Sequence, residues 1–177
     1  LALARMGDVD RAAELFGDYG LDRSGDPHHR AIGARLLKDR ALAMPAGDAR
    51  LAALAAACDA YGALFQDGGD PYPGINAASL AALCGRDTSA RSIADVILRH
   101  SAIDDPRDYY MAATGAEALL ILGHVTESEA MLRRAVTLDG ADHGARSTTC
   151  RQFAALAAHL GFGEAATERL LAPIRPP

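Results

Sequence analysis

Residues 115–138 read GAEALLILGHVTESEAMLRRAVTL, and this stretch decides the fold class of the chain. Apolar residues lead up to Gly123, and a second apolar pattern follows at Ser128, Leu132 and Ala135. Glycine ends a helix readily because it accepts the left-handed backbone of a tight turn. The small Ser128 lets a second helix approach the first, and Leu132 and Ala135 continue its apolar face. The stretch therefore predicts a hairpin of two helices.

The same arrangement recurs along the chain. Gly47, Gly85, Gly123 and Gly161 follow one another in equal steps of 38, and Gly7 precedes Gly47 by a slightly longer step. A single hairpin leaves one apolar face uncovered, so neighbouring hairpins must stack. We therefore predict an all-α fold, an α-solenoid of about five helix hairpins with a period of about 38 residues.

The predicted helix pairs are separated by turn-forming residues. They cover residues 1–6 and 8–19, 27–44 and 48–67, 73–84 and 87–101, 106–122 and 125–138, and 143–160 and 162–171. Asp70-Pro71 and Asp105-Pro106 place proline where a helix is expected to begin. We interpret residues 1–172 as a single helical-repeat domain cut from a longer multidomain protein, and residues 173–177 as the start of a linker.

Composition excludes several classes of protein. A net charge of −5 gives no electrostatic case for nucleic acid. The scattered Cys58, Cys84 and Cys150 indicate buried thiols in a reducing, cytoplasmic setting, and no histidine stands at zinc spacing. No apolar run is long enough to span a membrane. Of the 18 basic residues only Lys38 is a lysine, a bias typical of GC-rich bacterial genes. We expect no cofactor and no metal.

The order of glycine, small residue, leucine and alanine resembles the tetratricopeptide repeat, although that repeat has about 34 residues and an aromatic pair missing here. A narrower resemblance lies in DPYPGINAASL at residues 70–80, DYYMAAT at 108–114 and DHGARST at 142–148. These phrases are similar to a bacterial tetratricopeptide-like family with a "YPGINAATL" signature. That family is related to the central regulatory, TRAF-binding region of apoptosis signal-regulating kinases. The resemblance covers about residues 45–177, and it implies a regulatory scaffold in a signalling or defence protein and no known reaction.

Tetratricopeptide solenoids bind extended peptides in the groove lined by the first helix of each pair. When the glycines are aligned with that repeat, polar residues of three successive first helices fall on one wall. The candidate groove residues are Tyr72, Asn76, Ser79, Tyr110, Thr114, Glu117, Thr148, Arg151 and Gln152. The expected partner is a protein or peptide, including flanking domains of the same chain.

Structural roles compete with this interpretation. Asn76 could cap a helix that begins after Pro73-Gly74, and Tyr72 and Tyr110 could pack between hairpins. Glu117 lies on an otherwise apolar helix, and a buried carboxylate needs a partner. Arg151 or Arg146 could supply it. An unpaired Arg151 would instead suit a carboxylate or phosphate.

Three classes of function are compatible with a helical solenoid: enzyme, binding module and assembly module. The sequence contains no G-x-S-x-G, phosphate-binding loop or H-E-x-x-H motif, so we do not expect an enzyme. Binding of a protein or peptide is the first expectation. Assembly, as a homo-oligomer or on flanking domains, is the alternative, with an exposed apolar patch of Leu170, Leu171 and Ile174 as its expected sign. A small anionic ligand in the groove is a further alternative.

Overall fold

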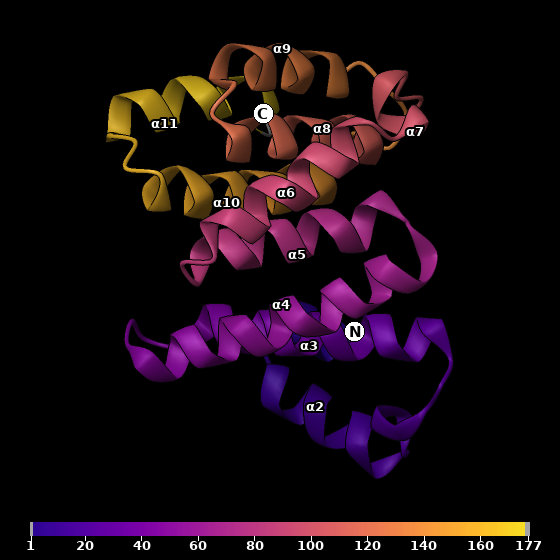
Figure 1. The fold of residues 1–177 in the computed structure, drawn as a ribbon. Coiled ribbons are helices and arrows are strands. Elements are labelled where there is room, and N and C mark those ends of the chain that lie inside the picture. Colours follow the sequence, from indigo (N-terminus) through magenta and orange to yellow (C-terminus); the bar gives the residue numbers. More distant parts are fainter. Residues whose placement is uncertain (1, 176–177) are drawn as a thin grey trace.

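The computed structural model describes residues 2–175, and ten of its α-helices form five consecutive pairs (Figure 1). The pairs are α1 (Ala2–Arg5) with α2 (Val9–Asp18), α3 (Pro27–Ala43) with α4 (Asp48–Gly68), α5 (Pro71–Leu83) with α6 (Asp87–Leu98), α8 (Tyr109–Leu122) with α9 (Val125–Ala135), and α10 (His143–His159) with α11 (Glu164–Leu171). One short helix, α7 (Ser101–Asp104), and two 3-10 turns, Leu21–Arg23 and Ala172–Ile174, complete the helical elements of residues 2–175. The predicted all-α fold of paired helices is confirmed.

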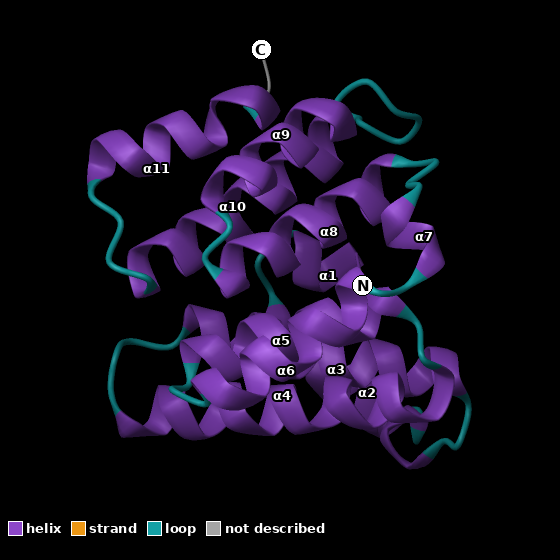
Figure 2. Cartoon of the chain, turned by 45° about the horizontal axis from the view of Figure 1, so that its top comes forward, coloured by secondary structure: helices purple, strands orange, loops and turns teal. Residues whose placement is uncertain are grey.

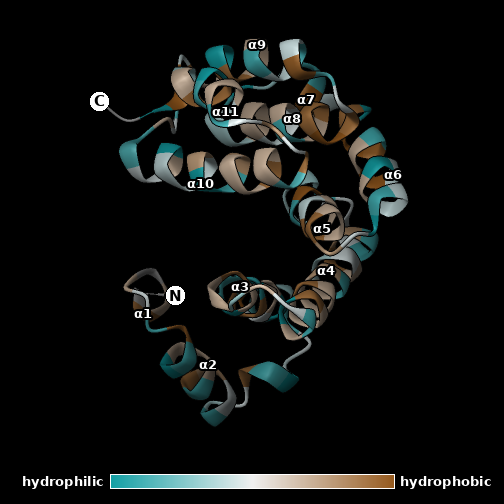
Figure 3. Ribbon diagram, turned by 90° about the vertical axis from the view of Figure 1, so that its left-hand side faces the viewer, coloured by the Kyte–Doolittle hydropathy of each residue, from teal (hydrophilic) through white to brown (hydrophobic). Residues whose placement is uncertain are grey.

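The pairs follow one another around a C-shaped body. In the first three junctions the second helix of one pair packs on the first helix of the next: α2 on α3, α4 on α5 and α6 on α8. At the last junction α9 packs instead on α11 and on the turn Ala172–Ile174. Figure 3 shows α3 and α10 facing each other across the opening of the C, with α5 to the right, at its closed side. Figure 2 shows loops confined to the ends of the helices. The first helices α3, α5 and α10 therefore border the inner face, and α8 packs behind α10 and α5.

Four of the five aligned glycines make the predicted turn. Gly7, Gly85, Gly123 and Gly161 have φ of 92°, 80°, 90° and 79°. After each, the next amide donates to a carbonyl five residues back, for example His124 N to Leu119 O at 2.9 Å. This bonding closes the first helix of each pair.

Gly47 is different. It is the N-cap of α4, with φ 147° and ψ 179°, and it follows a loop rather than closing a helix. The α3 helix ends at Ala43, and Pro45 in the intervening loop has no amide hydrogen to continue it. The prediction that all five glycines play one role is therefore wrong at Gly47.

Aspartates start the four main first helices. Asp26, Asp70, Asp108 and Asp142 each accept a hydrogen bond from a backbone amide in the first turn. Asp70-Pro71 begins α5 slightly earlier than predicted, at Pro71 instead of residue 73. Asp105-Pro106 does not begin a helix, because α8 starts at Tyr109 after the Asp108 cap.

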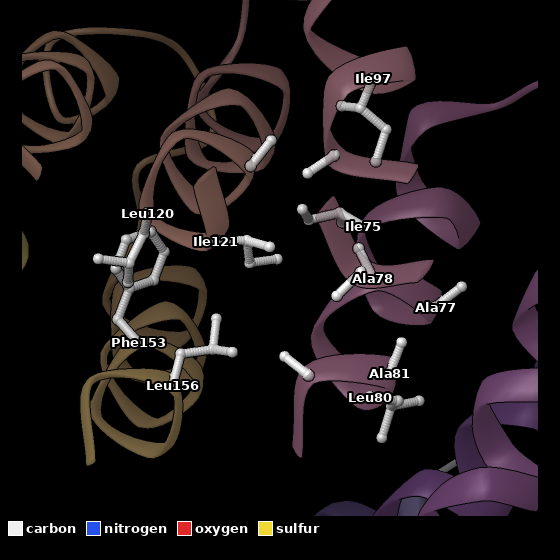
Figure 4. Close-up of a cluster of buried hydrophobic side chains, with 14 of the residues drawn as sticks. Ile75, Ala77, Ala78, Leu80, Ala81, Ile97, Leu120, Ile121, Phe153 and Leu156 are labelled. Carbon is white, nitrogen blue, oxygen red and sulfur yellow. The ribbon is translucent and has the colours of Figure 1, made fainter. Parts of the chain in front are cut away.

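The core lies between neighbouring first helices as well as between each first helix and its second-helix partner. Figure 4 shows Ile121 of α8 and Leu156 of α10 on one side, with Ile75 and Ala78 of α5 opposite them. The small Ser128 is fully buried, and its hydroxyl donates to the Ala116 carbonyl at 2.7 Å. This contact holds α9 close to α8, as the repeat pattern predicts.

The C-terminal end is packed rather than exposed. Leu170, Leu171 and Ile174 are all buried, so the expected apolar patch at this end is wrong. The turn Ala172–Ile174 folds back against α9 and α10. Arg146 Nε donates to the Ile174 carbonyl at 3.0 Å. Of the predicted linker, residues 173–175 are packed in this way, and residues 176–177 lie outside the described residues.

Candidate functional site at the inner face

Four residues occupy one repeat position on the main first helices, and three of them, Lys38, Asn76 and Gln152, are joined by hydrogen bonds that Lys38 donates. Lys38, Asn76, Thr114 and Gln152 follow one another in equal steps of 38, and they lie on α3, α5, α8 and α10. Because the hairpins stack with this period, equivalent positions of consecutive first helices lie side by side. The period predicted from the glycines is thus also the period of the polar residues.

Hydrogen bonds join these helices. Lys38 Nζ donates to Asn76 Oδ1 at 2.6 Å and to Gln152 Oε1 at 2.7 Å. Gln152 Nε2 donates to Glu117 Oε1 at 2.7 Å, and Ser79 Oγ donates to the same carboxylate oxygen. We call Lys38, Asn76, Ser79, Glu117 and Gln152 the inner polar cluster. It links four successive hairpins through side chains alone.

The cluster holds two opposite charges that do not touch. Burial raises the pKa of Glu117, while the bonds from Ser79 and Gln152 and the charge of Lys38 oppose that rise. Burial also lowers the pKa of Lys38, and the charge of Glu117 opposes this. The Gln152 amide stands between the two groups, so each charge is compensated only indirectly.

The structure divides the predicted groove residues into two sets. Asn76, Ser79, Glu117 and Gln152 are brought together in the cluster. Thr114 is buried as well, at the same repeat position as Asn76 and Gln152, but it forms none of the cluster's hydrogen bonds. The other four remain exposed: Tyr72 (43% exposed), Tyr110 (50%), Thr148 and Arg151. We call these four the rim residues. Tyr72 and Tyr110 lie one helical turn before Asn76 and Thr114, so each helix passes from an exposed aromatic to a buried polar residue.

The predicted partners of Glu117 are wrong. Arg151 contacts Thr148 Oγ1 at 3.5 Å, and Arg146 is bonded to the carbonyls of Ile174 and Arg175. Neither guanidinium forms an ion pair or hydrogen bond with Glu117. The positive charge that acts on Glu117 comes instead from Lys38, on a first helix near the other end of the chain.

The proposed structural roles are also revised. Asn76 does not cap a helix, because α5 starts at Pro71 and Asp70 supplies the cap. The Asn76 amide instead donates to the Tyr72 carbonyl at 2.9 Å. Tyr110 does pack, with its ring edge-on to Tyr109 at a centroid distance of 5.7 Å, and half of its surface stays exposed.

Sequence reasoning missed Lys38. Two signals point to it, because Lys38 is the only lysine and stands exactly one repeat before Asn76. The predicted groove residues come only from the third to fifth pairs. The residue one repeat of 38 before Asn76, in the second helix pair, is Lys38, the cation of the cluster.

The cluster offers hydrogen-bond donors and acceptors. It contains no cysteine and no histidine. Within residues 2–175, no three histidine, cysteine or acidic side chains gather as a metal site would require. None of the helices in that range combines the length and apolarity needed to cross a bilayer.

Comparison with known proteins agrees with this architecture. Residues 1–81 match the family model described as Tetratricopeptide Repeats-Sensor. The match covers less than half of the chain and runs from α1 through most of α5, including Asn76 and Ser79. No curated protein matches the chain. The paired helices and this similarity together support a tetratricopeptide-like interaction or sensor module, a type that is typically non-catalytic.

Proposed function

We propose that this module binds a protein or peptide partner through the rim residues, as the regulatory scaffold of a larger signalling or defence protein. The observation that carries the proposal is the repetition of exposed residues. Tyr72, Tyr110 and Thr148 occupy one repeat position at the start of three consecutive first helices. An extended chain crossing these helices would meet an equivalent side chain on each.

The chemistry of the rim suits recognition. Tyrosine and arginine are enriched among the residues that dominate binding energy at protein interfaces. Arg151 has the Thr148 hydroxyl as its side-chain partner and forms no ion pair with a carboxylate of the described residues. Its charge is therefore free for an acidic group. Asn76 and Gln152 of the inner polar cluster lie one helical turn after Tyr72 and Thr148 on the same helices.

A displayed library of random peptides, selected on the whole chain, tests the proposal. Selected peptides should bind the Tyr72→Ala/Tyr110→Ala double variant and the Arg151→Ala variant at least about tenfold more weakly, the loss of one interface anchor. Tyr19→Ala and Arg169→Ala change an exposed tyrosine and an exposed arginine in the outermost pairs, away from the first helices, and they should leave binding unchanged. Equal losses in the rim and control variants would contradict the proposal.

A small anionic ligand on the inner face is the second candidate. The position of Lys38 favours it, because an ammonium group there is held by two neutral amide oxygens. The assembly alternative is weakened by the burial of Leu170, Leu171 and Ile174, the residues on which it rested. A sizing experiment that gave a dimer broken by rim substitutions would revive it.

A further inference from the structure

The single lysine of the chain, Lys38, lies at a position where an ammonium group fits the hydrogen-bond acceptors better than a guanidinium group would. Every other basic residue is arginine, yet the position that bridges α3 to both α5 and α10 holds Lys38. A compact ammonium group points three N–H donors in different directions, whereas a planar guanidinium requires a flat, forked arrangement of acceptors. The inner polar cluster presents separate oxygens from α5 and α10, which suit an ammonium.

The partners of Lys38 leave its charge without direct compensation. Two donors go to the amide oxygens of Asn76 and Gln152, and the third finds no acceptor among the described residues. The charge of Glu117 is relayed through the Gln152 amide. A desolvated cation among neutral dipoles is costly unless an anion pairs with it. The Lys38 residue is partly exposed, but its ammonium group is buried against the two amides, so an incoming anion has to displace one of them to reach it.

The Lys38–Gln152 bond also joins the two ends of the C. It connects residues 114 positions apart, on α3 and α10. Within residues 2–175 these two helices share no extended packing, although both pack on neighbours such as α4 or α5. Figure 3 shows them facing each other across the opening. A change of partner at Lys38 would therefore release one end of the solenoid from the other.

We propose that Lys38 is the receptor for an acidic group, carboxylate or phosphate, of the bound ligand, and that this group displaces the Gln152 oxygen and so frees α3 from α10. Gln152 keeps its bond to Glu117 after the exchange, so the amide is not left without a partner. The acidic group would supply the direct ion pair that Lys38 lacks. This inference rests on the proposed binding function and names both its ligand chemistry and its structural consequence.

A lysine-specific label tests the first half directly. Protein grown with 15Nζ-lysine gives one side-chain signal, because Lys38 is the only lysine. Sodium glutarate and sodium phosphate are the two probes, each compared with sodium chloride at equal ionic strength. A saturable shift of the Lys38 signal with either probe supports the proposal, and the probe that binds more tightly tells a carboxylate source from a phosphate source. A shift no larger than that in chloride overturns it.

Variants separate the inner cation from the rim. Lys38→Met should abolish saturable binding of the tighter probe, and Glu117→Gln should tighten it about tenfold by removing the competing carboxylate. Arg169→Met, at an exposed arginine of α11 outside the site, should leave it unchanged. Binding that persists in Lys38→Met and disappears in Arg151→Met would place the anion on the rim and overturn the proposal. If Lys38→Met fails to fold, the 15Nζ signal of Lys38 is titrated in Arg151→Met instead. A saturable shift that persists there supports the proposal, and a shift that disappears overturns it.

Small-angle X-ray scattering tests the second half. The radius of gyration should increase when the tighter probe saturates the protein, and Lys38→Met should show the larger value without any probe. An unchanged radius with a saturated Lys38 signal would refute the release of α3 from α10. Failure of the function proposed for the rim would look different: selected peptides would ignore Tyr72 and Tyr110 while the Lys38 titration still succeeded.

Discussion

The central first helices α5 and α8 differ sharply from the outer first helices α3 and α10. Ten of the 13 residues of α5 and ten of the 14 of α8 are buried, against three of 17 in α3 and four of 17 in α10. All four belong to one repeat pattern, so the difference comes from position in the stack. The central helix α5 packs on α4, α6, α8 and α10, whereas α3 packs on α4 and the short α2, so α3 is covered on fewer sides.

This difference assigns separate tasks to the two kinds of helix. The central helices supply Asn76, Ser79 and Glu117, which are buried in the packed interior. The outer helices supply Lys38 and Gln152, which stay partly exposed and meet each other only through side chains. We infer that the central helices hold the fold and the outer helices provide its adjustable contact.

Removing a large side chain should give the greatest difference in stability loss between a central and an outer first helix. Leu120→Ala in α8 empties a fully buried site and should lower the free energy of unfolding by about 2–5 kcal/mol. Leu37→Ala in α3 removes the same group from a residue that is 43% exposed, and should cost less than about 1 kcal/mol. Urea unfolding followed by circular dichroism measures both. Similar losses would mean that α3 is packed as tightly as α8.

Adding a methyl group should separate the same helices with a smaller effect. A Cβ at Gly74 of α5 would lie 2.8 Å from the Phe65 ring, and one at Gly115 of α8 would lie 2.9 Å from Ile103 Cγ2. Either alanine substitution should cost about 1–3 kcal/mol through overpacking. At Gly33 of α3 the nearest atom, on Phe16, would be 3.4 Å away. Gly33→Ala should therefore gain up to about 1 kcal/mol from helix propensity. Thermal unfolding of the three variants tests this, and a stabilised Gly74→Ala would contradict the central packing.

Much of this organisation could be predicted from local signals. The apolar period and the glycine turns place ten helices close to their observed positions, because both are dictated by neighbouring residues in the chain. Gly47 misled for the same reason, since spacing does not reveal whether a glycine ends one helix or begins the next. Asp105-Pro106 misled because a later aspartate, Asp108, supplied the cap.

The site was predicted less completely, for a geometric reason. Asn76, Ser79, Glu117 and Gln152 could be identified because their positions repeat. Local patterns pointed to the adjacent unit, at Arg146 or Arg151, for the partner of the buried charge. The actual cation, Lys38, comes from a distant unit because the curvature of the solenoid brings α3 within reach of one side-chain hydrogen bond to α10. Curvature depends on how all the hairpins stack, and local residue patterns do not specify it.

The Lys38–Glu117 relation should appear as a pH effect. Lys38→Met removes a charge that lowers the pKa of Glu117, so that already raised pKa rises further. An acid with a raised pKa in the folded state binds more protons there, and stability falls as pH increases above its ordinary value of 4.5. The variant should therefore lose about 1–3 kcal/mol at pH 8, the cost of a poorly compensated buried charge. At pH 4, where Glu117 is largely protonated in both states, the loss should vanish.

Urea unfolding of Lys38→Met at several pH values measures this dependence. The double variant Lys38→Met/Glu117→Gln is the matched control, because it has no charge in the cluster to titrate. Its free energy of unfolding should change with pH only as the other titratable groups of the protein dictate. It should not show the extra fall between pH 4 and 8 that is expected for Lys38→Met alone. A pH-independent loss in the single variant would show that Lys38 matters for packing and not for its charge.

The smallest effect is expected where an outer helix is held by a surface ion pair. Arg30 of α3 contacts Asp67 of α4 at 2.6 Å, with both side chains substantially exposed. Asp67→Asn should change stability by less than about 1 kcal/mol, and the change should shrink as salt is added because water and ions screen such pairs. The charge at Lys38 is instead shielded from solvent, so the Lys38→Met loss at pH 8 should persist between 0.05 and 0.5 M sodium chloride, about a threefold change in screening length. Equal salt sensitivity in the two variants would place Lys38 among ordinary surface charges and remove the distinction between α3's outer contacts and its inner one.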